Sequence, residues 1–244
     1  MLLESPVAQF TVKDIGNKII ISGYNLSFSN SALAMLITAA IIMLFYYIAL
    51  KKPAIIPNKL QMLSEITYDF SLNLVQDNIN SNKAKLFFPL IFSIFIFFVV
   101  GNMIGLLPMS FAFTSQLIIT MCFAIFILVL ATVYGIYYHG LSFIRVLLPS
   151  GLPIYLAPMM VIIEFVSYFA RGLSMGVRLF ANIMAGHVIL DIFASFVIAL
   201  GIFGIIPLSF TVVLYAFEFA IGLLQAYIFA ILSCIFIDQV INLH

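Results

Sequence analysis

Long apolar runs separated by short polar connections dominate the pattern of the chain. Windows of about 20 apolar residues, the length of a membrane-spanning helix, fall near residues 32–50, 87–107 and 117–138. From Leu86 to Ile144 there is no Asp, Glu, Lys or Arg. Because one span needs only about 20 residues, this stretch must cross a membrane more than once.

The C-terminal part of the chain contains two apolar stretches, 154–200 and 202–241, that are long for simple spans. A helix over residues 158–199 would be about 60 Å long, roughly twice the hydrocarbon thickness of a bilayer. Turn-forming residues lie between the two stretches, at Gly201, and near the start of the second, at Gly204 and Pro207. We therefore expect a long helical hairpin that is strongly tilted within the membrane.

Lysines concentrate in the connection that follows the first span: Lys51, Lys52, Lys59, Lys83 and Lys85. The positive-inside rule places this connection on the cytoplasmic or matrix side, so residues 1–31 form an outer-side N-terminal segment. By alternation, residues 108–116 lie outside. The connection 139–152, which contains Arg145, and the C-terminal His244 lie inside.

Apolar residues within the basic connection recur at spacings of three and four, the pattern of an amphipathic helix: Leu60, Leu63, Ile66, Phe70 and Leu74. Pro57 and Asn58 precede them and suit the start of a helix. The predicted fold is an all-α polytopic membrane protein with about five membrane helices, one interfacial amphipathic helix and the tilted C-terminal hairpin. Residues 32–244 are expected to form a single integral membrane domain.

Composition agrees with a membrane environment, since 65% of the residues are hydrophobic and only 8% are charged. A soluble domain carries about 25% charged residues. The formal net charge of +1 offers no broad basic surface, so no nucleic-acid partner is expected. Cys122 and Cys234 lie inside apolar segments without metal-ligand spacing, and we interpret them as small core residues.

Polar residues are rare in the hairpin, but several of them share one face when placed on a helical wheel of 100° per residue. Five of them lie within about 40° of Arg178: Glu164, Ser167, Arg171, Ser174 and Asn182. His187 and Asp191 fall on the opposite face, so one helix can border two separate aqueous pockets. On the second stretch, Glu218 and Gln225 share a face, and Gly222 lies between them.

An ionised side chain at the centre of a membrane costs at least about 2.5–3.5 kcal/mol, so these groups need partners, water or a function. Arg171 and Arg178 are each compatible with pairing to an acid, Glu164 or Glu218, to hold helices together. His187 and Asp191 have the spacing of two metal ligands, but no cluster completes a site. Asp238 faces away from Glu218 and is compatible with a solvated helix end. Small residues near Arg178 suit close helix packing, whether within the chain or against a moving neighbour.

Several segments together carry a family resemblance: Ser5–Phe10, Gly101–Pro108, Glu164–Val166, Arg178–Asn182 followed by Ala185–His187, and Leu224–Tyr227. They resemble the signature of subunit a, or subunit 6, of F-type ATP synthases. The first of them is similar to the N-terminal segment of mitochondrial members and related bacteria. The resemblance covers nearly the whole chain.

The resemblance implies a proton-translocating stator subunit in the membrane sector of a rotary ATP synthase. Arg178 matches the family's essential arginine, which separates two aqueous half-channels facing a ring of c subunits. Asn182 and Gln225 match polar positions around that arginine. His187 and Glu218 match the pair of the outer half-channel, in the histidine-then-glutamate order of the mitochondrial type.

Two further acids are implied for the inner half-channel, Glu164 and, as a weaker candidate, Asp238. The resemblance places the chain in the mitochondrial inner membrane or the bacterial plasma membrane. No catalytic residue for ATP, no cofactor and no metal are expected. The implied partners are the c-subunit ring with its intramembrane carboxylate, peripheral-stalk b-type subunits, other ATP synthase membrane subunits, protons and lipid.

Elementary chemistry supports such a role for Arg178, because an arginine is always protonated and cannot itself relay protons. It attracts a carboxylate at 4 Å by about 4 kcal/mol at an effective dielectric of 20, which favours the ionised acid. Two rival hypotheses stay open. One is a self-contained secondary transporter or ion channel in which Arg178 binds an anion, and the other is a purely structural membrane subunit.

Overall fold

The computed structural model describes most of the chain: residues 10–15, 20–21, 24–25, 27–79, 84–107, 110–140 and 155–241. Some predicted features lie outside the described residues: positions 5–9 of the N-terminal motif, Lys83, Pro108, Arg145 and His244.

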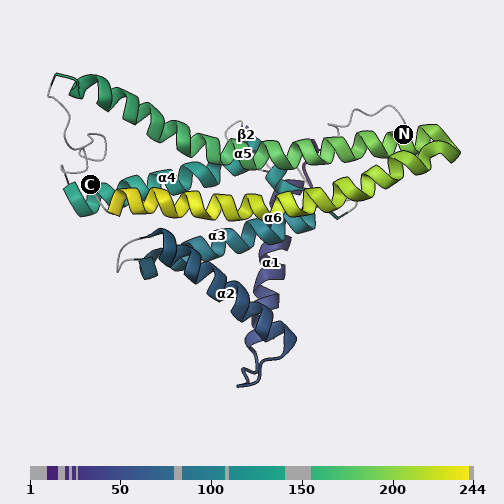
Figure 1. Ribbon diagram of the computed structural model, residues 1–244, viewed down its shortest axis with the longest axis horizontal. Helices are drawn as coiled ribbons and strands as arrows, with labels where there is room; N and C mark the ends of the chain where they lie inside the picture. Colours follow the sequence, from purple (N-terminus) through teal and green to yellow (C-terminus); the bar gives the residue numbers. More distant parts are fainter. Residues whose placement is uncertain are drawn as a thin grey trace. The chain divides into compact units, whose positions relative to one another are not determined.

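Helices account for nearly all of the described chain (Figure 1): α1 (Asn30–Leu50), α2 (Lys59–Asn78), α3 (Ala84–Gly105), α4 (Leu117–His139), α5 (Ala157–Leu200) and α6 (Ile205–Ile241). Two short strands, β1 (Ile20–Ile21) and β2 (Tyr24–Asn25), pair antiparallel before α1. Four stretches of the described residues are long and apolar enough to cross a membrane, and the last, Met159–Ile241, covers α5 from Met159 onward and all of α6. The predicted fold class, all-α and polytopic, is confirmed.

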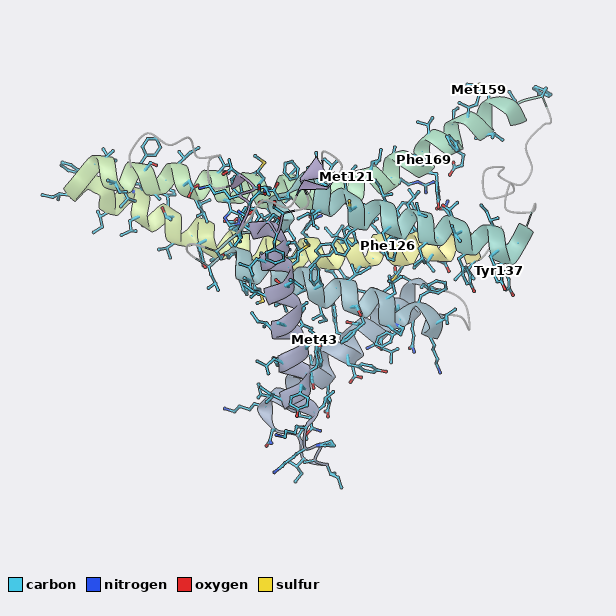
Figure 2. All side chains as sticks on the ribbon, turned by 180° about the vertical axis from the view of Figure 1, so that it is seen from behind. Met43, Met121, Phe126, Tyr137, Met159 and Phe169 are labelled. Carbon is cyan, nitrogen blue, oxygen red and sulfur yellow. The ribbon has the colours of Figure 1, made fainter. Side chains whose placement is uncertain are left out.

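The spanning helices carry large apolar side chains on their outer surfaces. Met43 projects from α1, and Phe126 and Tyr137 project from α4 (Figure 2), with exposed fractions of 67%, 51% and 86%. Such a surface is unfavourable in water but matches the hydrocarbon interior of a bilayer. These helices therefore present lipid-compatible faces outward.

The amphipathic helix α2 begins after Asn58 and turns its apolar stripe outward. Four of the five residues that predicted the stripe are exposed: Leu60, Leu63, Ile66 and Phe70. The face buried within the protein instead carries Gln61, Ser64 and Ser71 as well as Leu74 and Val75. The two serine hydroxyls donate to backbone carbonyls of α2 itself. Outward apolar residues on an amphipathic helix are the arrangement that surface binding to a membrane requires.

A tight turn joins the two longest helices. Gly201 has a φ of 54°, a left-handed conformation that side chains with a Cβ rarely adopt. Gly204 contacts the carbonyl of Val197 so closely that a Cβ would collide with it. Pro207 lies in the first turn of α6, where its missing N–H leaves no hydrogen bond unmade. The end of α5 and the start of α6 consequently run side by side in opposite directions (Figure 1).

The length of α5 exceeds that of a perpendicular span. Its 44 residues correspond to about 66 Å, against a hydrocarbon thickness of about 30 Å. The helix is continuous from Ala157 to Leu200, so no break shortens it. A strong tilt in the bilayer follows from this length as a prediction.

The chain divides into two compact units. Unit 1 contains Met1–Lys52, Ile96–Gln116 and Leu179–Ala226, and unit 2 contains Pro53–Phe95, Leu117–Arg178 and Tyr227–His244. Both hairpin helices contribute to both units, because α5 divides after Arg178 and α6 after Ala226. The organisation of residues 32–244 as one membrane domain stays a prediction.

Candidate functional site

The first polar pair lies in unit 1, between the second half of α5 and the first half of α6. His187 Nε2 is 3.7 Å from Glu218 Oε1. Glu218 is only 3% exposed, and neither of its carboxylate oxygens has a hydrogen-bond partner among the described residues. The carboxylate lies against Gly186, where a Cβ would come within 2.6 Å of Oε1. A residue with a side chain at position 186 would therefore displace the acid.

A second polar contact of unit 1 joins the same two helices. Asn182 Nδ2 donates a hydrogen bond of 2.8 Å to Gln225 Oε1, and Gln225 is 1% exposed. Beside the two contacts is a cavity of about 190 Å³ lined by Asn182, Ala185, Gly186, Ile189, Leu214, Phe217, Glu218 and Ile221. Since a water molecule occupies about 30 Å³ of liquid, this cavity has room for several waters.

Helix α3 supports the acid-bearing face of α6. Asn102 Nδ2 donates a hydrogen bond of 2.9 Å to the carbonyl of Gly222, one helical turn after Glu218. Tyr215 donates from its hydroxyl to the carbonyl of Leu106, at 2.9 Å. Asn102 is 3% exposed and its Oδ1 has no partner among the described residues. The sequence offered one signal for this residue, an amide inside a stretch without charged residues.

The helical wheel placed Asn182 and His187 on different sides of α5, yet both side chains reach α6. Ile183, which is 4% exposed, lies between them on the wheel, so the buried side of α5 is centred between the two polar residues. The two polar residues flank that centre, one on each side. The predicted change of face therefore does not direct His187 away from the hairpin.

The other polar pair lies in unit 2, on the first half of α5. Arg171 Nη2 is 2.7 Å from Glu164 Oε1, and the side chains are 45% and 25% exposed. Arg171 also donates to the carbonyl of Ser167 at 3.3 Å and to Gln239 Oε1 of α6 at 3.4 Å. Of the two predicted partners, Arg171 thus pairs with Glu164. The ion pair stays within α5, and only the contact to Gln239 crosses to α6.

Arg178 is an exposed residue at the edge of unit 2. It lines a cavity of about 290 Å³ with Ala170, Arg171, Ser174, Leu232, Ile235, Phe236 and Gln239. Among the described residues, no carboxylate or other acceptor contacts its guanidinium. Asp238 is not part of the cavity lining, whereas its neighbour Gln239, which the sequence did not single out, is.

Small residues before Arg178 serve packing within the chain. Gly172 lies against Leu128 of α4, and Gly176 lies against Ala124 and the carbonyl of Thr120, with no free space for a Cβ. Both glycines are buried in unit 2. For these two positions, close helix packing within the chain accounts for the small residues.

The fold and these sites define a polytopic helical membrane protein with ionisable side chains on the two helices of its C-terminal hairpin. A model of the ATP synthase A chain family matches residues 32–238. ATP synthase subunit a of Pelagibacter ubique is 44% identical over 241 residues, covering 98% of both chains. ATP synthase subunit a of Rhodospirillum rubrum is 40% identical over 243 residues, covering 99% of this chain and 100% of the relative. The chain belongs to the ATP synthase A chain family.

Proposed function

We propose that the chain is the proton-translocating stator subunit of a rotary F-type ATP synthase, with two aqueous half-channels that face a c-subunit ring and are separated by Arg178. One observation carries the proposal. Arg178 is exposed, lines a cavity and has no acceptor among the described residues. A cation in an apolar helix needs a counter-charge, and a carboxylate of the passing ring supplies it.

The outer half-channel is assigned to His187, Glu218, Asn182 and Gln225. The cavity beside Glu218 gives water a place to reach the acid. Glu218 is buried without a hydrogen bond to the described chain, so its carboxylate is free to exchange a proton. His187 suits a donor because imidazole titrates near neutral pH. Protons then pass from this pair to the ring.

The inner half-channel is assigned to Glu164, with Asp238 as a further candidate. Glu164 is one-quarter exposed, and its partner Arg171 lines the same cavity as Arg178. A ring carboxylate next to Arg178 is favoured in its ionised form, so it gives up its proton there. Arg178 stays protonated, so it cannot relay protons by titrating and its fixed charge blocks direct leakage between the two half-channels.

The proposed partners follow from this role: the c-subunit ring, peripheral-stalk b-type subunits and the other membrane subunits of the complex, together with lipid. The membrane is the bacterial plasma membrane or the mitochondrial inner membrane. The positive-inside rule and the lysines that follow α1 support an orientation with that connection on the cytoplasmic or matrix side, the N-terminus outside and the C-terminus inside.

The test is ATP-driven proton pumping by vesicles that contain the assembled complex with Arg178→Ala. We expect pumping to be lost while the subunit still assembles, and pumping at the parent rate would overturn the proposal. Two arginines on one cavity also fit a self-contained anion transporter. Flux of an inorganic anion through liposomes that contain only the purified chain would favour that rival, and the absence of flux supports the stator role.

A further inference from the structure

The described part of the N-terminal segment contacts the outer polar pair. Residues 10–15, named here the N-terminal strap, precede α1 in unit 1. The ring of Phe10 meets the imidazole of His187 edge-on, with 5.9 Å between ring centroids and 69° between ring planes. This is a favourable geometry for an aromatic pair. His187 thus contacts both Phe10 and Glu218.

Hydrogen bonds fix the strap to other residues of unit 1, among them Gln116 and Asn30. Gln116, the residue before α4, donates from Nε2 to the carbonyl of Phe10 at 2.7 Å. Asn30, the first residue of α1, donates to the carbonyl of Thr11 at 3.3 Å and accepts from the backbone N–H of Lys13 at 3.2 Å. Because Gln116 bonds the backbone carbonyl of Phe10, it restrains the residue that carries the ring.

The His187–Glu218 pair does not restrain its own geometry. Its 3.7 Å separation is longer than a hydrogen bond, and an imidazole can turn about two side-chain bonds. Proton transfer requires hydrogen-bond distance or one bridging water, so the direction of Nε2 matters. A restraint from outside the pair is needed, and Phe10 is in contact with the ring.

We propose that Phe10 is a positioning residue for proton transfer: it holds the His187 imidazole with Nε2 toward Glu218 and shields that ring from bulk water, and Gln116 anchors it. This inference rests on the function proposed above for His187 and Glu218. Beside the side-chain bonds to Asn30, two backbone bonds already tie the strap to the start of α1: Ile15 N–H donates to the carbonyl of Phe28 at 2.6 Å, and Asn30 N–H donates to the carbonyl of Lys13 at 3.1 Å. The additional bond at Phe10 places a side chain on the ionisable pair.

Chemical modification tests the shielding without reference to transport. Diethyl pyrocarbonate would be applied to membranes that contain the assembled complex, and the modified histidines would be quantified by peptide mass spectrometry. We expect Phe10→Ala to accelerate modification of His187 by roughly two- to tenfold, the range for loss of one aromatic contact. His139, which lies in unit 2 and bonds the carbonyl of Ile241, is the internal reference. Equal rates at His187 in parent and variant would overturn the proposal.

Pumping measurements test the positioning role. Phe10→Ala should slow ATP-driven pumping by a similar factor, whereas Phe10→Tyr, which retains the ring, should pump at nearly the parent rate. Gln116→Ala, which releases the anchor, should fall between them. Phe28→Ala is the matched control, because Phe28 is an exposed phenylalanine of the same unit. The substitution retains its backbone carbonyl, which accepts from Ile15 N–H of the strap. A loss in Phe28→Ala equal to that in Phe10→Ala would sink the assignment.

The same substitution in a His187→Gln background separates positioning from general stability. If Phe10 acts through the imidazole, Phe10→Ala causes no further loss there. An undiminished loss would show a structural role and overturn the inference. Pumping by Arg178→Ala in the same membranes tests the proposed function. The modification rate of His187 tests the contact with Phe10, because that rate does not depend on pumping.

Discussion

The hairpin carries two acid–base pairs, and they are built in opposite ways. In unit 1, His187 is 16% exposed and Glu218 is buried, the two are 3.7 Å apart, and the carboxylate has no hydrogen bond to the described chain. Arg171 and Glu164 in unit 2 are more exposed and 2.7 Å apart, and the arginine makes two further contacts. Burial without hydrogen bonds leaves an acid poorly stabilised as an anion, whereas a charge-assisted bond stabilises it. The first pair is therefore suited to hold and pass a proton, and the second to keep its acid charged.

The largest effect expected from this contrast is at the buried acid. Glu218→Gln should lower ATP-driven proton pumping by roughly 10²-fold, the scale of losing a proton-transfer group, and Glu164→Gln should lower it much less. Replacing His187 by Glu in the Glu218→Gln protein should restore part of the rate by returning a carboxylate to the pair. Parallel assays of the three proteins in vesicles with equal amounts of complex measure this. Similar losses for the two Gln variants would remove the distinction between the sites.

A smaller effect is expected from the packing that holds the buried acid. Gly186→Ala would place a methyl group 2.6 Å from Glu218 Oε1, an overpacking that costs about 1–3 kcal/mol. Gly222→Ala is the matched control on α6, because its added methyl would lie 3.4 Å from Asn102. Thermal unfolding of the purified complex should show a lower midpoint for Gly186→Ala than for Gly222→Ala. The reverse order would contradict the close approach of Glu218 to α5.

The smallest effect is expected at the exposed pair. A double-mutant cycle of Glu164→Gln and Arg171→Gln, read by thermal unfolding, should give a coupling energy of about 0.2–1 kcal/mol, because water screens the pair. In pumping assays, Arg171→Gln should have little effect in a protein that already carries Glu164→Gln. A coupling of several kcal/mol would place this pair in the buried class, contrary to its exposure.

Much of the fold follows from the sequence because lipid imposes a simple rule on helix composition. Apolar runs of span length, the charge-free stretch and the glycines between α5 and α6 all carry local information. Arg178 and Glu218 stand out for the same reason, as ionisable groups that are costly in an apolar segment. Local patterns suffice for these features.

Other features depend on which elements meet, and a local pattern carries no such information. The rotation of about 100° per helical residue gives the angle between Asn182 and His187 around α5. It does not tell which side of α5 the neighbouring helix covers. Gln239 joins the Arg178 cavity only because α6 passes there. Phe10 lies far from His187 in sequence and meets it only in the folded chain. The apolar stripe of α2 likewise faces outward because lipid is an apolar solvent outside the protein. The amphipathic pattern of soluble proteins assumes that only water lies there.

The tight turn between α5 and α6 has a consequence for register. His187 lies as many residues before Gly201 as Glu218 lies after Gly204, and Asn182 and Gln225 face each other farther from the same turn. In an antiparallel hairpin, the number of residues in the turn decides which side chains are opposite. One residue inserted between Gly201 and Gly204 and taken up as helix would rotate α6 by about 100° and advance it by about 1.5 Å relative to α5. Both polar pairs would then be mismatched at once, so the length of this turn is as constrained as the identity of the residues that carry charge.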